Sequence, residues 1–173
     1  MKIAIIYISK YGTTAKVAQM IAGRLISNQV SIIDLKKDRH PDFHSYDGII
    51  LGTSIYAGNS SKMMQRFCKQ NFETLMQKRL ALFVCGMEQD SAKQQQELAN
   101  AYPQMLYQHA ASTCFVGGEF QFEKMNFFER AIIKRIAKTD KSVSQIKEDG
   151  IEKLVMEYQK NNRSEKGIKS KIK

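Results

Sequence analysis

The sequence lacks long apolar runs, a CxxC pair and both common nucleotide-binding fingerprints. Its apolar runs are far shorter than the ~20 residues of a membrane-spanning helix, and we expect no signal peptide before the first of them. The three cysteines are widely spaced, which favours reduced thiols over a disulfide framework. Because the three histidines form no ligand pattern with the cysteines, we predict a cytoplasmic protein without a bound metal.

The net charge of +10 is distributed unevenly. Most of the excess lies in two segments, 124–141 and 160–173, which indicates an anionic partner. The second segment is rich in Lys, Ser and Asn, so we expect a disordered tail. Since no aromatic residues alternate with its basic side chains, we do not expect nucleic-acid binding.

Short β-branched runs alternate with helical patterns along the chain. We predict strands at 3–8, 30–35, 48–52, 80–85 and 113–116. Helices are predicted at 14–27, 61–71 and 142–158, and a long helical stretch follows the fourth strand and ends at about residue 109. This alternation predicts an α/β fold, a doubly wound, five-stranded parallel sheet of order 2-1-3-4-5. The length predicts one domain, 1–159, carrying an insertion at 119–141 and the basic tail at 160–173.

The loop after the first strand, 9–14, brings hydroxyls and backbone amides to a helix N-terminus. Unpaired N–H groups and the positive end of the helix dipole favour a phosphate there. GxxxxGK[ST] and GxGxxG are both absent, which argues against a nucleoside triphosphate with magnesium and against a dinucleotide. A hydroxyl-rich loop suits one terminal monophosphate without a lysine. The alternative is that these residues only cap the helix.

Two further loops follow the third and fourth strands. Residues 53–59 contain hydroxyls, a glycine and Tyr56, whose ring offers a surface on which a flat ligand could stack, although ordinary loop packing is the alternative. Residues 85–88 follow the next strand. In a doubly wound sheet these loops and the first one meet at the topological switch point, where ligands bind.

The insertion contains a basic amphipathic helix. Its apolar positions 128, 132 and 136 share one face, and Arg130, Lys134 and Lys138 share the opposite face. Three interpretations stay open: cations exposed to solvent, contact with a membrane surface, or one wall of a pocket for an anionic substrate.

The loop Ser9-Lys10-Tyr11-Gly12-Thr13-Thr14 resembles the [ST]-x-T-G-x-T pattern of the flavodoxin family. The stretch Gly52-Thr53-Ser54-Ile55, the later Gly58, the pair Gly117-Gly118 and residues 127–134 resemble the menaquinone-dependent protoporphyrinogen oxidases, a flavodoxin-fold family. The resemblance implies non-covalent FMN, with its phosphate on the first loop and its ring between the second and third loops. It also implies that the Gly58 carbonyl meets flavin N5, since glycine can flip without steric cost.

The activity implied is that of an FMN-dependent oxidoreductase, which passes electrons from a porphyrinogen through FMN to a quinone. The alternatives are a non-enzymatic electron carrier that meets a redox partner protein and a scaffold that binds no flavin. We expect substrate carboxylates or peripheral membrane contact at Phe128, Arg130, Lys134 and Lys138. The resemblance places the cofactor on Ser9, Lys10, Tyr11, Gly12, Thr13, Thr14, Thr53, Ser54, Ile55, Tyr56, Ala57, Gly58, Cys85, Gly86, Met87 and Glu88, and no protein side chain is assigned a catalytic role.

Overall fold

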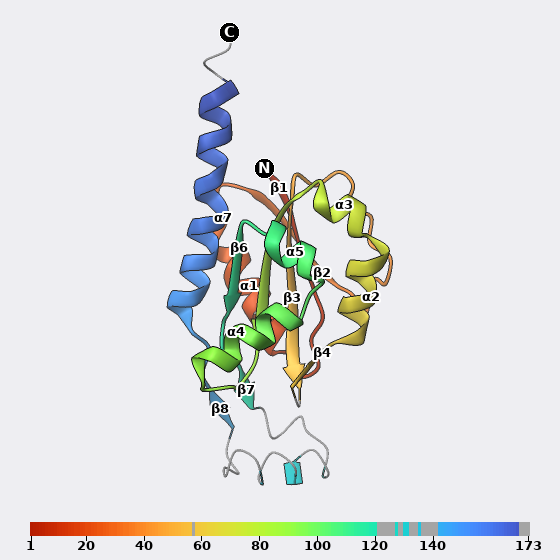
Figure 1. The fold of residues 1–173 in the computed structure, drawn as a ribbon, viewed down its shortest axis with the longest axis vertical. Coiled ribbons are helices and arrows are strands. Elements are labelled where there is room, and N and C mark those ends of the chain that lie inside the picture. The colour runs from red at the N-terminus through yellow and green to blue at the C-terminus, as the bar shows by residue number, and fades with distance from the viewer. Residues whose placement is uncertain (57, 121–126, 128–129, 132–134, 136–141, 170–173) are drawn as a thin grey trace.

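The fold is a parallel sheet between two layers of helices (Figure 1). A computed structural model of the chain describes residues 1–56, 58–120, 127, 130–131, 135 and 142–169. The parallel strands lie in the order β2-β1-β3-β5-β6, which confirms the predicted topology. They are β1 (Lys2–Tyr7), β2 (Gln29–Asp34), β3 (Gly48–Tyr56), β5 (Arg79–Cys85) and β6 (Ser112–Phe115).

Each face of the sheet has its own apolar core. Ile3 and Ile5 point to one face and Ala4 and Ile6 to the other, and all four are buried, as the alternation of a doubly covered strand requires. The first face is covered by α1 (Thr13–Arg24) and α7 (Glu148–Lys169). The second is covered by α2 (Lys62–Gln70), α3 (Phe72–Met76), α4 (Ser91–Asn100) and α5 (Gln104–His109).

The second predicted loop differs from its expected form. Residues 53–56 continue strand β3, and the chain turns back at Gly58 into β4 (Asn59–Ser60), which pairs antiparallel with the end of β3. Gly58 has φ +75°, a backbone conformation that suits glycine in such a tight turn. The hydroxyl-rich segment is therefore a short ribbon rather than a loop.

Two helix predictions needed correction. The helical stretch up to about residue 109 is divided into α4 and α5, because Pro103 has no N–H to continue the first helix. The last helix begins at Glu148, later than predicted, and its backbone stays helical to Lys169, through most of the segment expected to be a disordered tail. That segment contains lysine, arginine and glutamate, which are good helix formers, and it has no proline.

The insertion is joined to the domain by a short stem. Strands β7 (Glu119–Phe120) and β8 (Val143–Ser144) pair antiparallel and bring its two ends together. Within it, Arg130 and Arg135 have helical backbone and are exposed. The other predicted contacts there, Phe128, Lys134 and Lys138, lie outside the described residues. No helix in the described part of the chain is long and apolar enough to cross a membrane.

Candidate functional site

A narrow cleft lies at the carboxyl ends of the central strands, where Figure 1 shows the arrowhead of β3. Its free volume is about 60 Å³. The structure brings eleven of the predicted site residues to its walls, and two residues outside the prediction join them. The lining consists of Ser9, Lys10, Tyr11, Thr13, Thr14, Ser54, Ile55, Tyr56, Cys85, Gly86, Met87, Gly118 and Glu119.

Helix α1 points an uncapped N-terminus at this cleft. Its N-cap residue, Gly12, has φ 105° and makes no side-chain cap hydrogen bond. By contrast, the Ser61 hydroxyl caps α2 and the Asp90 carboxylate caps α4, at 2.8 Å from the Lys93 N–H. The first N–H groups of α1 therefore lack the side-chain acceptor that the other two helices have, and they remain available to an anion.

The hydroxyls of the first loop do not act as helix caps. Ser9 Oγ accepts from the Gly12 N–H at 2.9 Å, which fixes the turn rather than the helix end. Thr13 and Thr14 are buried, and in the described part of the chain Thr14 Oγ1 has no hydrogen-bond partner beyond a weak interaction with the neighbouring Cys85 thiol. Because a buried hydroxyl without a partner costs free energy, Thr14 Oγ1 at the uncapped helix end marks a site for a polar ligand group.

Two tyrosines and a lysine gather at the cleft. The rings of Tyr11 and Tyr56 lie 6.3 Å apart at 59°, and Lys10 Nζ lies 3.8 Å from the centre of the Tyr56 ring. The same ammonium lies 5.0 Å from the Tyr11 ring, so one cation contacts two aromatic faces. Tyr56 therefore offers a face to a flat ligand, and in this structure Lys10 lies over its ring.

The third wall is built by close backbone packing. The Gly86 N–H donates to the Gly117 carbonyl at 3.1 Å, and a Cβ on Gly118 would come within 2.8 Å of the Gly86 carbonyl oxygen. Only glycine fits at position 118, because the two loops touch through their main chains. This contact holds the loop after β5 against the loop after β6 at the edge of the cleft.

Cys85 is the one thiol that lines the cleft, and it is fully buried. Burial raises the pKa of its thiol to about 12, although the nearby Thr14 hydroxyl acts in the opposite direction. Glu119 and Cys114 add smaller effects that raise the pKa further. Cys85 therefore stays protonated at neutral pH and is not a nucleophile.

Four predicted residues do not line the cleft: Gly12, Thr53, Gly58 and Glu88. Gly12 and Gly58 shape the turns beside it, while Thr53 is fully buried. Glu88 Oε1 accepts from the N–H groups of Gln89 and Asp90 and so orders its own loop. Ala57 lies outside the described residues.

The sequence interpretation missed Gly118 and Glu119. Glu119 supplies the carboxylate of the cleft, and its side chain is only 8% exposed. The glycine pair at 117–118 was the available signal, because it marks the end of β6 at the same edge of the sheet as the other three loops.

The fold agrees with the comparisons. Residues 4–146 match the Flavodoxin domain, so the chain belongs to the flavodoxin-domain family. It is 23% identical over 144 residues to protoporphyrinogen IX dehydrogenase (quinone) of Escherichia coli strain K12. The aligned region covers 80% of this chain and 80% of the relative.

Solved flavodoxins share the fold at low sequence identity. Flavodoxin of Streptococcus pneumoniae TIGR4 superposes with TM-score 0.53 and 16% identity, over 95% of this chain and 99% of that one. Two-electron reduced flavodoxin of Megasphaera elsdenii has TM-score 0.51 and 18% identity, over 67% and 82%.

Proposed function

We propose that the cleft binds FMN non-covalently and that the protein is an FMN-dependent oxidoreductase. The observation that carries the proposal is the buried hydroxyl of Thr14, which has no strong hydrogen-bond partner, at the uncapped N-terminus of α1. A terminal phosphate would accept from that hydroxyl and from the first N–H groups of the helix. Membership of the flavodoxin-domain family supports the same cofactor.

The other walls fit the rest of such a cofactor. Tyr56 would stack on the flavin ring, and Cys85, Gly86 and Met87 would enclose its other side. Entry of a ring requires Lys10 to leave the Tyr56 face, and an exposed cation–π contact is worth only about 0.5–1 kcal/mol. Displacement of Lys10 from the Tyr56 ring is therefore only a small cost to flavin binding.

When bound, FMN supplies the electron-transfer chemistry. The chain's own part is to bind and to orient: the main-chain amides of α1 hold the anion, and the packed glycines at 86 and 118 fix the distance between two loops. The Cys85 thiol stays neutral there and takes no part in electron transfer.

For the substrate, we propose a porphyrinogen as donor and a quinone as acceptor. The relative in Escherichia coli is named for that activity, and the match covers most of both chains. Exposed Arg130 and Arg135 of the insertion offer cations to substrate carboxylates or to an anionic membrane surface.

A second candidate function is electron transfer without turnover of a small substrate. The likeness to flavodoxins over nearly the whole chain favours it. The two functions differ in one observable, because only the enzyme oxidises protoporphyrinogen IX in a protein-dependent and quinone-dependent way.

The cofactor is tested by titrating the chain with FMN and following the quenching of flavin fluorescence. Thr14→Val keeps the side-chain shape but removes the hydroxyl, and we expect it to lower the affinity for FMN about tenfold or more. Thr113→Val on the edge strand β6 is the matched control and should leave the affinity unchanged. Absence of binding by the unaltered chain, or equal affinity of all three proteins, would contradict the assignment.

Substrate turnover is then measured anaerobically with FMN-loaded protein, protoporphyrinogen IX and a menaquinone analogue, with free FMN as the control. Rapid porphyrin fluorescence that needs both protein and quinone supports the enzyme. Bound, reducible FMN without turnover supports the electron carrier.

A further inference from the structure

A second cavity, of about 480 Å³, lies between helix α2 and the segment that follows β2. Its floor is apolar, formed by Leu35, Met63 and Phe67. Leu35 and Phe67 are buried members of the main core, and Met63 is half-buried against that core. The volume is within the range of sites for small organic molecules, roughly 300–1,000 Å³.

The rim of this cavity is cationic. Arg39, Lys62 and Arg66 all line it and are exposed, and none of them forms an ion pair with another residue among those the structure describes. His40 lies beside them, and no acidic side chain among the residues that the structure describes lines the cavity. A positive rim above an apolar floor is complementary to a molecule that has an acidic group on an apolar body.

The positions of two cations on α2 add a second argument. Lys62 is the first residue of the helix, where the helix dipole disfavours positive charge, and no acidic residue occurs in that first turn. Arg66 follows one turn later, and like charges at this spacing repel each other by a few tenths of a kcal/mol. Both unfavourable interactions would be relieved by an anion between the two side chains.

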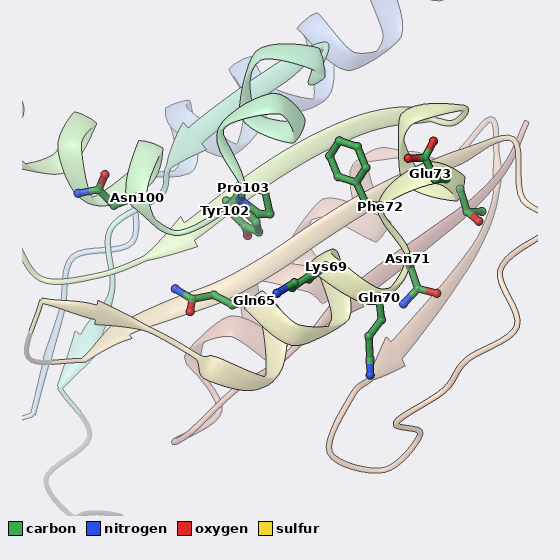
Figure 2. A pocket seen from close by; sticks show the side chains of 10 residues that line it. Gln65, Lys69, Gln70, Asn71, Phe72, Glu73, Asn100, Tyr102 and Pro103 are labelled. Atoms are coloured by element: carbon green, nitrogen blue, oxygen red, sulfur yellow. The ribbon is translucent and has the colours of Figure 1, made fainter.

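The larger cavity in Figure 2, of about 690 Å³, also lies along α2, shares Gln70 with the cavity described above and has a lining without net charge. There Lys69 is accompanied by the carboxylate of Glu73, and most of the other polar side chains are amides. It carries no excess charge to select an anion. The excess of positive charge is therefore specific to the cavity lined by Arg39, Lys62 and Arg66, which we call the cationic cavity.

We propose that the cationic cavity is a binding site for a small amphipathic organic acid, with its apolar body on Met63 and Phe67 and its acidic group on Lys62 and Arg66. The site begins directly after β4, which pairs with the end of β3, and Tyr56 of that strand lines the cleft. A ligand would thus lie beside the ribbon that forms one wall of the cleft. The proposal does not depend on FMN binding.

The test uses two fluorescent probes with the same apolar body: 8-anilinonaphthalene-1-sulfonate, which is an anion, and N-phenyl-1-naphthylamine, which lacks the sulfonate. Each probe is titrated into the full chain and into the double variant Lys62→Gln/Arg66→Gln. Lys69→Gln is the matched control on the same helix, and Lys10→Gln controls for probe binding in the cleft. Because the substituted side chains are exposed and glutamine is a good helix former, the variants keep α2 intact, which circular dichroism verifies.

We expect the double variant to bind the anionic probe at least tenfold more weakly, while both single controls stay within twofold of the unaltered chain. Affinity for the neutral probe should change less than twofold in every variant. Unchanged affinity of the double variant for the anionic probe would overturn the proposal. So would an equal loss in Lys69→Gln or Lys10→Gln, or an equal loss for the neutral probe.

Discussion

Lys16 Nζ lies 2.5 Å from Glu119 Oε1, and this pair joins the second turn of α1 to the stem of the insertion. The Ser144 hydroxyl donates to the same carboxylate oxygen at 2.9 Å, so α1, β7 and β8 meet at one side chain. Glu119 also lines the cleft. A negative charge beside a site for a phosphate would repel that ligand unless a cation neutralised it, and Lys16 is placed to do so.

The first prediction concerns this pair. Lys16→Met removes a cationic partner of the Glu119 carboxylate, and we expect FMN to bind about three- to tenfold more weakly. Glu119→Gln should bind FMN as tightly as the unaltered chain or more tightly. In the double variant the affinity should return to within threefold of the original, as measured by fluorescence titration. If the double variant stays as weak as Lys16→Met, Lys16 acts directly on the cofactor and the neutralising role is refuted.

A second prediction concerns Lys10, which lines the cleft and so carries a positive charge beside the flavin even after its ammonium has left the Tyr56 face. A positive charge at the cleft lowers the energy of a reduced, anionic flavin, so Lys10→Met should lower the reduction potential of bound FMN. An interaction on the order of 1 kcal/mol corresponds to about 40 mV for a one-electron couple.

The matched control for this potential is Lys2→Met. Lys2 makes the same kind of contact, 4.7 Å from the Tyr46 ring, but it lies at the opposite end of β1 from the cleft. Anaerobic spectroelectrochemical titration of the three FMN-loaded proteins measures the shift. Equal potentials in Lys10→Met and the unaltered chain would show that the ammonium moves away from the bound ring.

A third prediction concerns the Tyr102 hydroxyl, which is buried in the core. It approaches the main-chain carbonyls of Leu51 at 3.1 Å and Phe83 at 2.7 Å, and so connects β3 with β5. Tyr102→Phe should lower the free energy of unfolding by about 1–2 kcal/mol, because a buried acceptor loses its donor. Tyr107→Phe on α5 is the control and should stay within about 0.5 kcal/mol. Urea unfolding measures both values, and equal stability of the two variants would refute the role of this hydrogen bond.

The parallel sheet could be predicted because its signals are local. Each central strand contains a short apolar run, such as residues 3–8, and the edge where loops meet follows from the strand order alone. The same reasoning predicts that Thr14 and Tyr56 lie at the same edge of the sheet, although they are far apart in the chain.

What could not be predicted depends on packing between distant segments. The side chain of Glu119 enters the cleft because β7 pairs with β8, and a two-residue ribbon leaves no period to recognise in sequence. The cationic cavity was missed for the same reason. In the sequence, Lys62 and Arg66 have the pattern of an ordinary exposed helix face. Only the fold brings Arg39, from the segment after β2, beside them.

The last prediction concerns stability at alkaline pH. Burial raises the pKa of Cys68 to about 12, whereas a cysteine thiol in an unfolded chain has a pKa near 8.5. Above about pH 8.5 the unfolded chain therefore loses this proton while the folded chain keeps it. The contribution of Cys68 is fully present below pH 8.5 and is lost progressively up to pH ~12, by as much as about 1.4 kcal/mol per pH unit.

Cys68→Ala isolates this effect, since it removes one titrating group from the core and leaves the others unchanged. The substitution lowers the stability at neutral pH through the small cavity it leaves, but the informative quantity is the slope of the unfolding free energy against pH. Urea unfolding between pH 7.5 and 10.5 should give a shallower fall for the variant than for the unaltered chain. Cys85 and Cys114 contribute to the remaining fall, because burial also raises their pKa values, to about 12 and about 11. Parallel curves for the two proteins would mean that the Cys68 thiol is accessible to deprotonation in the folded state.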